Sequence, residues 1–104
     1  MSLGLWITAT RPTTVHDDNV TYNLAPMLRL AGFWDDLYES NDAKAETMIP
    51  KLRAGLDAML SDPDKFKALN PANGWGDYYG AVRFTRGVLE ACVAHPDGVI
   101  GLSR

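Results

Sequence analysis

The segment Leu3-Gly4-Leu5-Trp6-Ile7-Thr8-Ala9-Thr10 places apolar side chains at every second position near the start of the chain. Leu3, Leu5 and Ile7 fall on one face of an extended backbone, and Trp6 falls on the other. A period of two with aromatic and branched residues is typical of a β-strand with one buried face. This segment therefore predicts a strand that needs a partner elsewhere in the chain.

The opposite end of the chain offers that partner. Val99-Ile100-Gly101-Leu102 follows the turn-forming residues Pro96-Asp97-Gly98 and predicts a second strand. Because neither strand would be stable alone, we expect residues 4–9 and 98–103 to pair. We interpret residues 11–19, which begin with Arg-Pro, as a polar connection that ends the first strand.

Helical periodicity fills most of the chain between these strands. A stripe with helical spacing predicts a short first helix and comprises Leu24, Met27, Leu28 and Ala31. We expect Asn23 to cap this helix, Pro26 to lie in its first turn and Gly32 to end it. Phe33 to Tyr38 is interpreted as a link to the next helix.

A longer stripe predicts a second helix over residues 43–60. Pro50 lies inside it on the polar side, so we expect one helix with a kink at this residue. Gly55 lies on the apolar side, which indicates that a neighbouring element packs closely there.

Two further helices are predicted. Asp62-Pro63 is a typical helix start and favours a short helix ending at Leu69. The last helix is expected to begin at Asp77 or Tyr78 and to end at Ala94. Its apolar stripe comprises Tyr78, Ala81, Val82, Thr85, Val88, Leu89 and Cys92.

These elements predict a mainly helical α+β fold, with three to four helices packed on a small sheet that pairs the N- and C-terminal strands. A chain of 104 residues is expected to form a single domain, residues 1–104.

Composition narrows the classes of function. The net charge of −3 argues against a nucleic-acid partner, which normally requires a basic surface. A single cysteine, Cys92, excludes an internal disulfide and favours a reducing, cytoplasmic setting. We find no signal peptide and no apolar stretch long enough for a membrane span. We therefore expect a small soluble protein without membrane association.

The densest turn and aromatic chemistry lies in residues 70–80, Asn-Pro-Ala-Asn-Gly-Trp-Gly-Asp-Tyr-Tyr-Gly, called here the aromatic segment. It matches no phosphate-binding loop, because it lacks both GxGxxG and a Gly-Lys-Ser/Thr sequence. Trp75, Tyr78 and Tyr79 are candidates to stack a ligand or anchor a partner. The favoured interpretation is structural, with Trp75 filling the core beside the last helix.

The densest polar cluster lies in residues 16–23. His16, Asp17, Asp18 and Asn23 are candidates for binding a ligand or a metal, or for general acid–base catalysis. Adjacent side chains diverge, however, and no metal-binding spacing supports the cluster. We favour a solvated loop whose Asp and Asn side chains cap a helix start, and we expect no metal and no cofactor.

Three other polar or reactive features have structural interpretations. Asp35, Asp36 and Glu39 form an acidic group that we expect to be solvated surface. His95 is placed at the end of the last helix, where a cationic side chain is favourable. Cys92 lies on an apolar stripe and is expected to be a buried, unreactive thiol.

Residues 19–24, 70–76, 82–84 and 89–92 resemble a family of small proteins of actinobacteria and their phages. The resemblance covers the chain from about residue 18 onward, and Pro26 departs from the family pattern. It implies a bacterial or phage setting and supplies no activity or catalytic residues.

Two functions remain open. The first is a non-catalytic binding or interaction module that uses the aromatic segment to contact a protein partner or a second copy of the chain. The alternative is a small enzyme, or a metal- or ligand-binding protein, that uses residues 16–23. A pocket joining His16, Asn23 and Trp75 would favour the alternative, and a flat apolar patch would favour the first. The first is preferred because it requires no constellation that the spacing fails to show.

Overall fold

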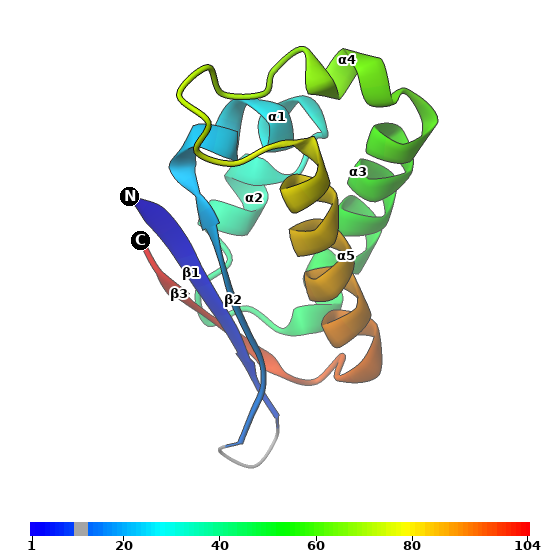
Figure 1. Ribbon diagram of the computed structural model, residues 1–104. Coiled ribbons are helices and arrows are strands. Elements are labelled where there is room, and N and C mark those ends of the chain that lie inside the picture. The colour runs from blue at the N-terminus through cyan, green and yellow to red at the C-terminus, as the bar shows by residue number, and fades with distance from the viewer. Residues whose placement is uncertain (10–12) are drawn as a thin grey trace.

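The computed structural model describes residues 1–9 and 13–104 and confirms the α+β class (Figure 1). In this described part of the chain, three strands form an antiparallel sheet in the order β2-β1-β3, namely β1 (Ser2–Thr8), β2 (Thr14–Thr21) and β3 (Val99–Ser103). The predicted pairing of the chain ends is confirmed, because β1 and β3 are antiparallel neighbours from Gly4↔Ser103 to Thr8↔Val99. The two termini lie side by side in Figure 1.

Residues 14–21 form strand β2, so the prediction of a polar connection over residues 11–19 was wrong for these residues. Residues 10–12, including the predicted strand end at Arg11-Pro12, lie outside the described residues. Strand β2 lies at the edge of the sheet, and its side chains are partly solvated on both faces. Its sequence therefore shows no clear alternation of apolar and polar residues. Charged residues on an edge strand also discourage unwanted pairing with other chains.

The sheet buries one face. Leu3, Leu5 and Ile7 have no exposed surface and point toward the helices, which gather on one side of the sheet (Figure 1). On the other face the Trp6 indole lies directly across Gly101, where a Cβ atom would stand 2.2 Å from the ring. Gly101 is therefore required by the close approach of this indole.

The described residues also form five α-helices and two short 3₁₀ helices: η1 (Tyr22–Leu24), α1 (Ala25–Leu30), α2 (Trp34–Tyr38), η2 (Ala45–Met48), α3 (Ile49–Ser61), α4 (Pro63–Lys67) and α5 (Tyr78–Ala94). The helices outnumber the expected three to four because the segment interpreted as a link after Gly32 forms α2. None of the described helices is long and apolar enough to cross a bilayer.

The two prolines that fall within predicted helices, Pro26 and Pro50, lie at helix starts. Pro26 and Pro50 are each the second residue of an α-helix that follows a 3₁₀ turn, where no intrahelical N–H is needed. The predicted single helix over residues 43–60 with a kink at Pro50 was therefore wrong. The predicted cap was wrong too, because the side chain of Thr21, rather than that of Asn23, accepts a backbone N–H at this start.

The core lies between the sheet and the packed pair α3 and α5. Gly55 of α3 confirms the predicted close approach, because a Cβ atom there would stand 2.4 Å from the Phe33 ring. The predicted boundaries of α5 are confirmed, with Asp77 as its cap, and the whole predicted apolar stripe of α5 is buried. This frame fixes both ends of the aromatic segment.

Candidate functional site

The aromatic segment connects α4 to α5 and turns sharply at two glycines. Gly74 and Gly76 have φ angles of 75° and 95°, in the region that favours glycine. A Cβ atom on Gly76 would stand 2.8 Å from Thr21 and 3.0 Å from Leu24. The backbone itself therefore closes this end of the core, and the neighbouring side chains turn outward.

The favoured placement of Trp75 in the core was wrong. Its side chain is 69% exposed, whereas Tyr78 is only 5% exposed and fills the core position. The Tyr78 hydroxyl donates a 2.7 Å hydrogen bond to the Met59 carbonyl, and the Tyr78 N–H donates to Asn70 Oδ1 at 2.8 Å. The backbone of Gly76, rather than the Trp75 indole, packs against Thr21 and Leu24 beneath the segment.

Trp75 borders a cleft of about 550 Å³ between the aromatic segment and the start of the first helical turn. We call it the asparagine cleft, and its lining includes Ser2, Asn19, Thr21, Asn23, Asn73 and Trp75. It joins two of the site candidates, Asn23 and Trp75, although they are far apart in sequence. His16 is not part of its lining.

A chain of hydrogen bonds organises the asparagine cleft. The backbone N–H of Trp75 donates to Asn73 Oδ1 at 2.9 Å, and Asn73 Nδ2 donates to Asn23 Oδ1 at 3.3 Å. Asn23 Nδ2 then donates to Thr21 Oγ1 at 2.9 Å. The amides therefore fix one another, and they tie the aromatic segment to the end of β2.

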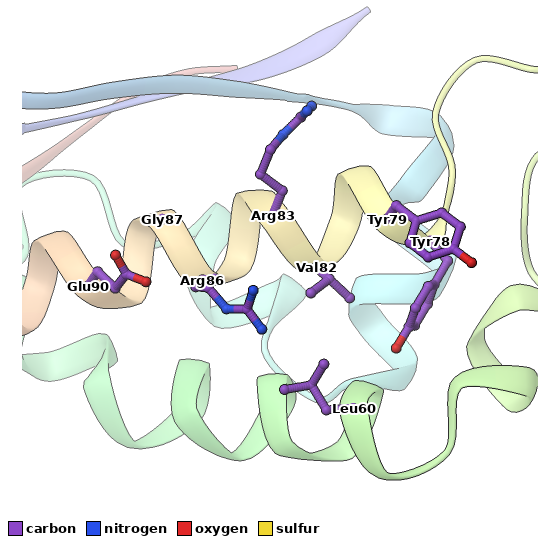
Figure 2. Close-up of a pocket in the computed structure, with 8 residues that line it drawn as sticks. All are labelled: Leu60, Tyr78, Tyr79, Val82, Arg83, Arg86, Gly87 and Glu90. Atoms are coloured by element: carbon purple, nitrogen blue, oxygen red, sulfur yellow. The ribbon is translucent and has the colours of Figure 1, made fainter.

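The other exposed aromatic of the segment, Tyr79, borders a second depression of about 520 Å³ along α5. We call it the α5 groove, and its lining includes Leu60, Tyr79, Val82, Arg83, Arg86 and Glu90. Figure 2 shows Leu60, Val82 and Arg86 pointing into the space between α3 and α5, whereas Arg83 points toward the sheet. Tyr79 is 67% exposed and Leu60 is 46% exposed.

Two positive charges border the α5 groove, Lys67 beside Tyr79 and Arg86 farther along α5 toward Glu90. Lys67 Nζ lies 5.1 Å from the centre of the Tyr79 ring, within the range of a cation–π contact. A hydrogen bond with Tyr79 is the main cause that raises the pKa of Lys67, so this lysine stays charged. Arg86 makes no ion pair with any described residue. Glu90 supplies a negative charge at the other end of the lining.

The predicted polar cluster of residues 16–23 is divided by the strand that carries it. His16 and Asp18 pair with Ile7 and Leu5, the inward-facing residues of β1, while Asp17 pairs with outward-facing Trp6. His16 packs against α5, with its Cε1 atom 3.4 Å from the position of a Cβ on Gly87. The described residues hold no group of three His, Cys, Asp or Glu side chains able to bind a metal.

The remaining candidate features have structural roles. Asp35 pairs with Arg29 at 3.4 Å, and Asp36 pairs with Lys51, so this acidic surface already has cationic partners within the chain. Cys92 is fully buried, and desolvation raises the pKa of its thiol to about 11. A neutral, buried thiol is a poor nucleophile at neutral pH.

The sequence reasoning missed several residues that line the two surfaces. Asn19 was assigned to the polar connection over residues 11–19, Thr21 was given no role, and Asn73 was treated only as a turn former. Leu60 was assigned to the apolar stripe of the helix predicted over residues 43–60, but it is 46% exposed. Arg86 gave no signal, because the α5 groove forms only when α3 packs beside α5. Spacing within either helix does not reveal that juxtaposition.

Comparisons of the chain with protein-family models, with curated proteins and with solved structures each return no significant match. The asparagine cleft and the α5 groove therefore carry the functional inference.

Proposed function

We propose that this chain is a small non-catalytic binding module of a bacterial or phage cytoplasm, and that it binds a short peptide segment of a partner protein in the α5 groove. The observation that supports this most is the exposure of Tyr79 and Leu60 around Arg86. Large apolar side chains beside an arginine that makes no ion pair with the described residues are the residue types that dominate protein interfaces.

The occupant that fits the α5 groove is an acidic peptide with an apolar anchor. Leu60 and Val82 offer an apolar surface for the anchor between the two helices. Arg86 offers a guanidinium fork that suits a carboxylate, and Lys67 adds a second positive charge near Tyr79. Glu90 disfavours a further acidic residue at its own end of the groove. The peptide is therefore expected to carry its acidic residues between Arg86 and the Tyr79 end.

The alternative, an enzyme or metal protein that uses residues 16–23, has weaker support. Strand β2 points His16 and Asp18 to one face and Asp17 to the other. Only Asn23 among these candidates reaches a cleft with Trp75. That part of the alternative concerns ligand binding rather than catalysis.

Selection from a displayed library of random peptides tests the proposal. The wild-type protein should enrich peptides that combine an aspartate or glutamate with a neighbouring large apolar residue. Tyr79→Ala and Arg86→Ala should each weaken the selected peptides by about tenfold or more, as expected for anchor residues. Trp75→Ala, which changes the same segment outside the groove, should bind them normally.

Two results would overturn the peptide assignment. One is enrichment of peptides without acidic residues, or of peptides that bind Tyr79→Ala as well as the parent. The other is a concentration-dependent dimer, seen by sedimentation, that Tyr79→Ala abolishes. The second result would make another copy of this chain the occupant of the groove.

A further inference from the structure

We propose that the asparagine cleft binds a neutral saccharide, with the Trp75 indole as the platform on which a sugar ring stacks. This site is separate from the α5 groove and does not depend on the peptide proposed to bind there. It combines an exposed aromatic face with several neutral hydrogen-bonding groups. The sites that hold small ligands typically pair an apolar surface with a few placed polar groups in this way.

The polar groups of the cleft are held in place but are only partly used. Asn73 and Asn23 each donate one N–H and accept one hydrogen bond within the chain of amides. A primary amide has two N–H donors and two acceptor lone pairs, so each asparagine keeps one donor and one acceptor for a ligand. Thr21 Oγ1 accepts from Asn23 and keeps its own hydrogen to donate.

This mixture of groups matches the hydroxyls of a sugar. A sugar hydroxyl both donates and accepts, so neighbouring hydroxyls need adjacent donors and acceptors of the kind that Asn23 and Asn73 present. Asn19 adds a further amide to the lining. Internal hydrogen bonds already orient the amides of Asn23 and Asn73, which reduces the entropy lost when a ligand binds.

The indole supplies the apolar half of the site. One face of a pyranose ring carries C–H groups and packs flat against an aromatic surface, and Trp offers the largest such surface. Trp75 is 69% exposed while its backbone N–H is fixed by Asn73, so the ring is presented at the cleft. Exposing so much apolar surface without a partner is unfavourable, which a stacked ring would relieve.

Charge distinguishes a saccharide from a nucleotide, the other common ligand that stacks on Trp. The described side chains that line the cleft are all neutral, and the terminal amino group of Met1, which also belongs to the lining, is the one positive charge among these residues. The chain as a whole has a net charge of −3, which disfavours an anionic ligand. A neutral ligand is therefore favoured over an anionic one.

Titration by two-dimensional ¹H–¹⁵N NMR tests the site directly. The probes are neutral mono- and disaccharides of glucose, galactose, mannose and N-acetylglucosamine, with adenosine monophosphate as the anionic stacking competitor. At least one saccharide should saturate with a Kd in or below the millimolar range, about −4 kcal/mol or stronger. The shifts should be confined to residues 19–23 and 73–76 and to the indole N–H of Trp75.

Variants separate the site from the fold and from the α5 groove. Trp75→Ala should keep a dispersed spectrum and lose at least tenfold in affinity, and Asn73→Ala should weaken binding as well. Tyr79→Ala should bind the saccharide like the parent. The proposal is wrong if no saccharide saturates at about 50 mM, if Trp75→Ala binds equally well, or if only the nucleotide shifts the cleft residues. A saccharide site without peptide binding would leave this inference standing while removing the proposed function of the α5 groove.

Discussion

Gly55→Ala should destabilise the protein even though alanine is the better helix former. In an ordinary helix interior this change stabilises by about 1 kcal/mol. Here the new Cβ would stand 2.4 Å from Cδ2 and 2.8 Å from Cε2 of Phe33, and 3.2 Å from the Ala31 carbonyl oxygen. Phe33 has no exposed surface, so its ring has no free space into which to retreat. Overpacking of this kind costs about 3 kcal/mol, which leaves a net loss of about 2 kcal/mol after the helix gain.

Gly87→Ala is the matched control, because it makes the same change in the interior of α5. A Cβ atom there would meet only His16, at an ordinary contact distance of 3.4 Å. This variant should therefore gain up to about 1 kcal/mol. Urea denaturation followed by circular dichroism gives both values, with unchanged m-values if the transition stays two-state. The two midpoints should move in opposite directions.

The size of the effect makes the comparison decisive. A loss of about 2 kcal/mol lowers Tm by on the order of 10 °C in a domain of this length. If Gly55→Ala were as stable as the parent or more stable, Phe33 would not pack against α3 as described. The reasoning that places the turn before α2 over α3 would then be refuted.

Two further variants and one labelling experiment test other parts of the structure. Tyr78→Phe removes the hydroxyl that donates to the Met59 carbonyl near the end of α3. The free energy of unfolding measured in urea should fall by about 1–3 kcal/mol, because this buried carbonyl would lose its partner. An unchanged midpoint would contradict that hydrogen bond. Deletion of residues 99–104 removes β3 and the fully buried Ile100. The cooperative thermal transition seen by calorimetry should therefore disappear. A sharp transition would show that β1 does not need this partner. Burial raises the pKa of Cys92 from 9.0 to about 11, so its thiol is neutral at pH 8. Labelling by iodoacetamide, followed by mass spectrometry, should therefore proceed only as fast as the protein unfolds. Rapid labelling of the folded protein would refute the burial of this side chain.

Local patterns predicted the elements with strong local signals. The alternation around Leu5 identified β1, and the helical stripe from Tyr78 to Cys92 identified α5. The pairing of the chain ends followed from the need of each short strand for a partner. These features depend on residues close together in sequence, or on backbone groups that must be satisfied.

The errors arose where tertiary packing outweighs local pattern. Strand β2 is a polar edge strand, so its side chains carry little apolar alternation and its ladder with β1 decides its conformation. Pro50 fits a kink and a helix start equally well by spacing, and only the preceding 3₁₀ turn distinguishes them. Trp75 was expected in the core like Tyr78, but only Tyr78 is buried, and the segment packs there through the backbone of Gly76 against Thr21. The sequence alone does not show that contact.

The sequence predicted only some of the residues that line the two candidate surfaces. The sequence singled out Trp75, Tyr79 and Asn23, and each of them lines one of the two surfaces. It did not predict that Asn23 and Trp75 line one cleft, because that arrangement depends on the hydrogen bond from Asn73 to Asn23 across the fold. The α5 groove was not anticipated, because Leu60 and Arg86 come from two different helices.

The central claim is that the aromatic segment presents Trp75 for binding and does not use it to hold the core together. The most direct measurement is the free energy of unfolding of Trp75→Ala in urea. A buried Trp typically costs 3–5 kcal/mol when truncated to Ala. Because Trp75 is 69% exposed, we expect a loss of about 1 kcal/mol or less. A loss of about 3 kcal/mol or more would place the indole in the core and contradict the account.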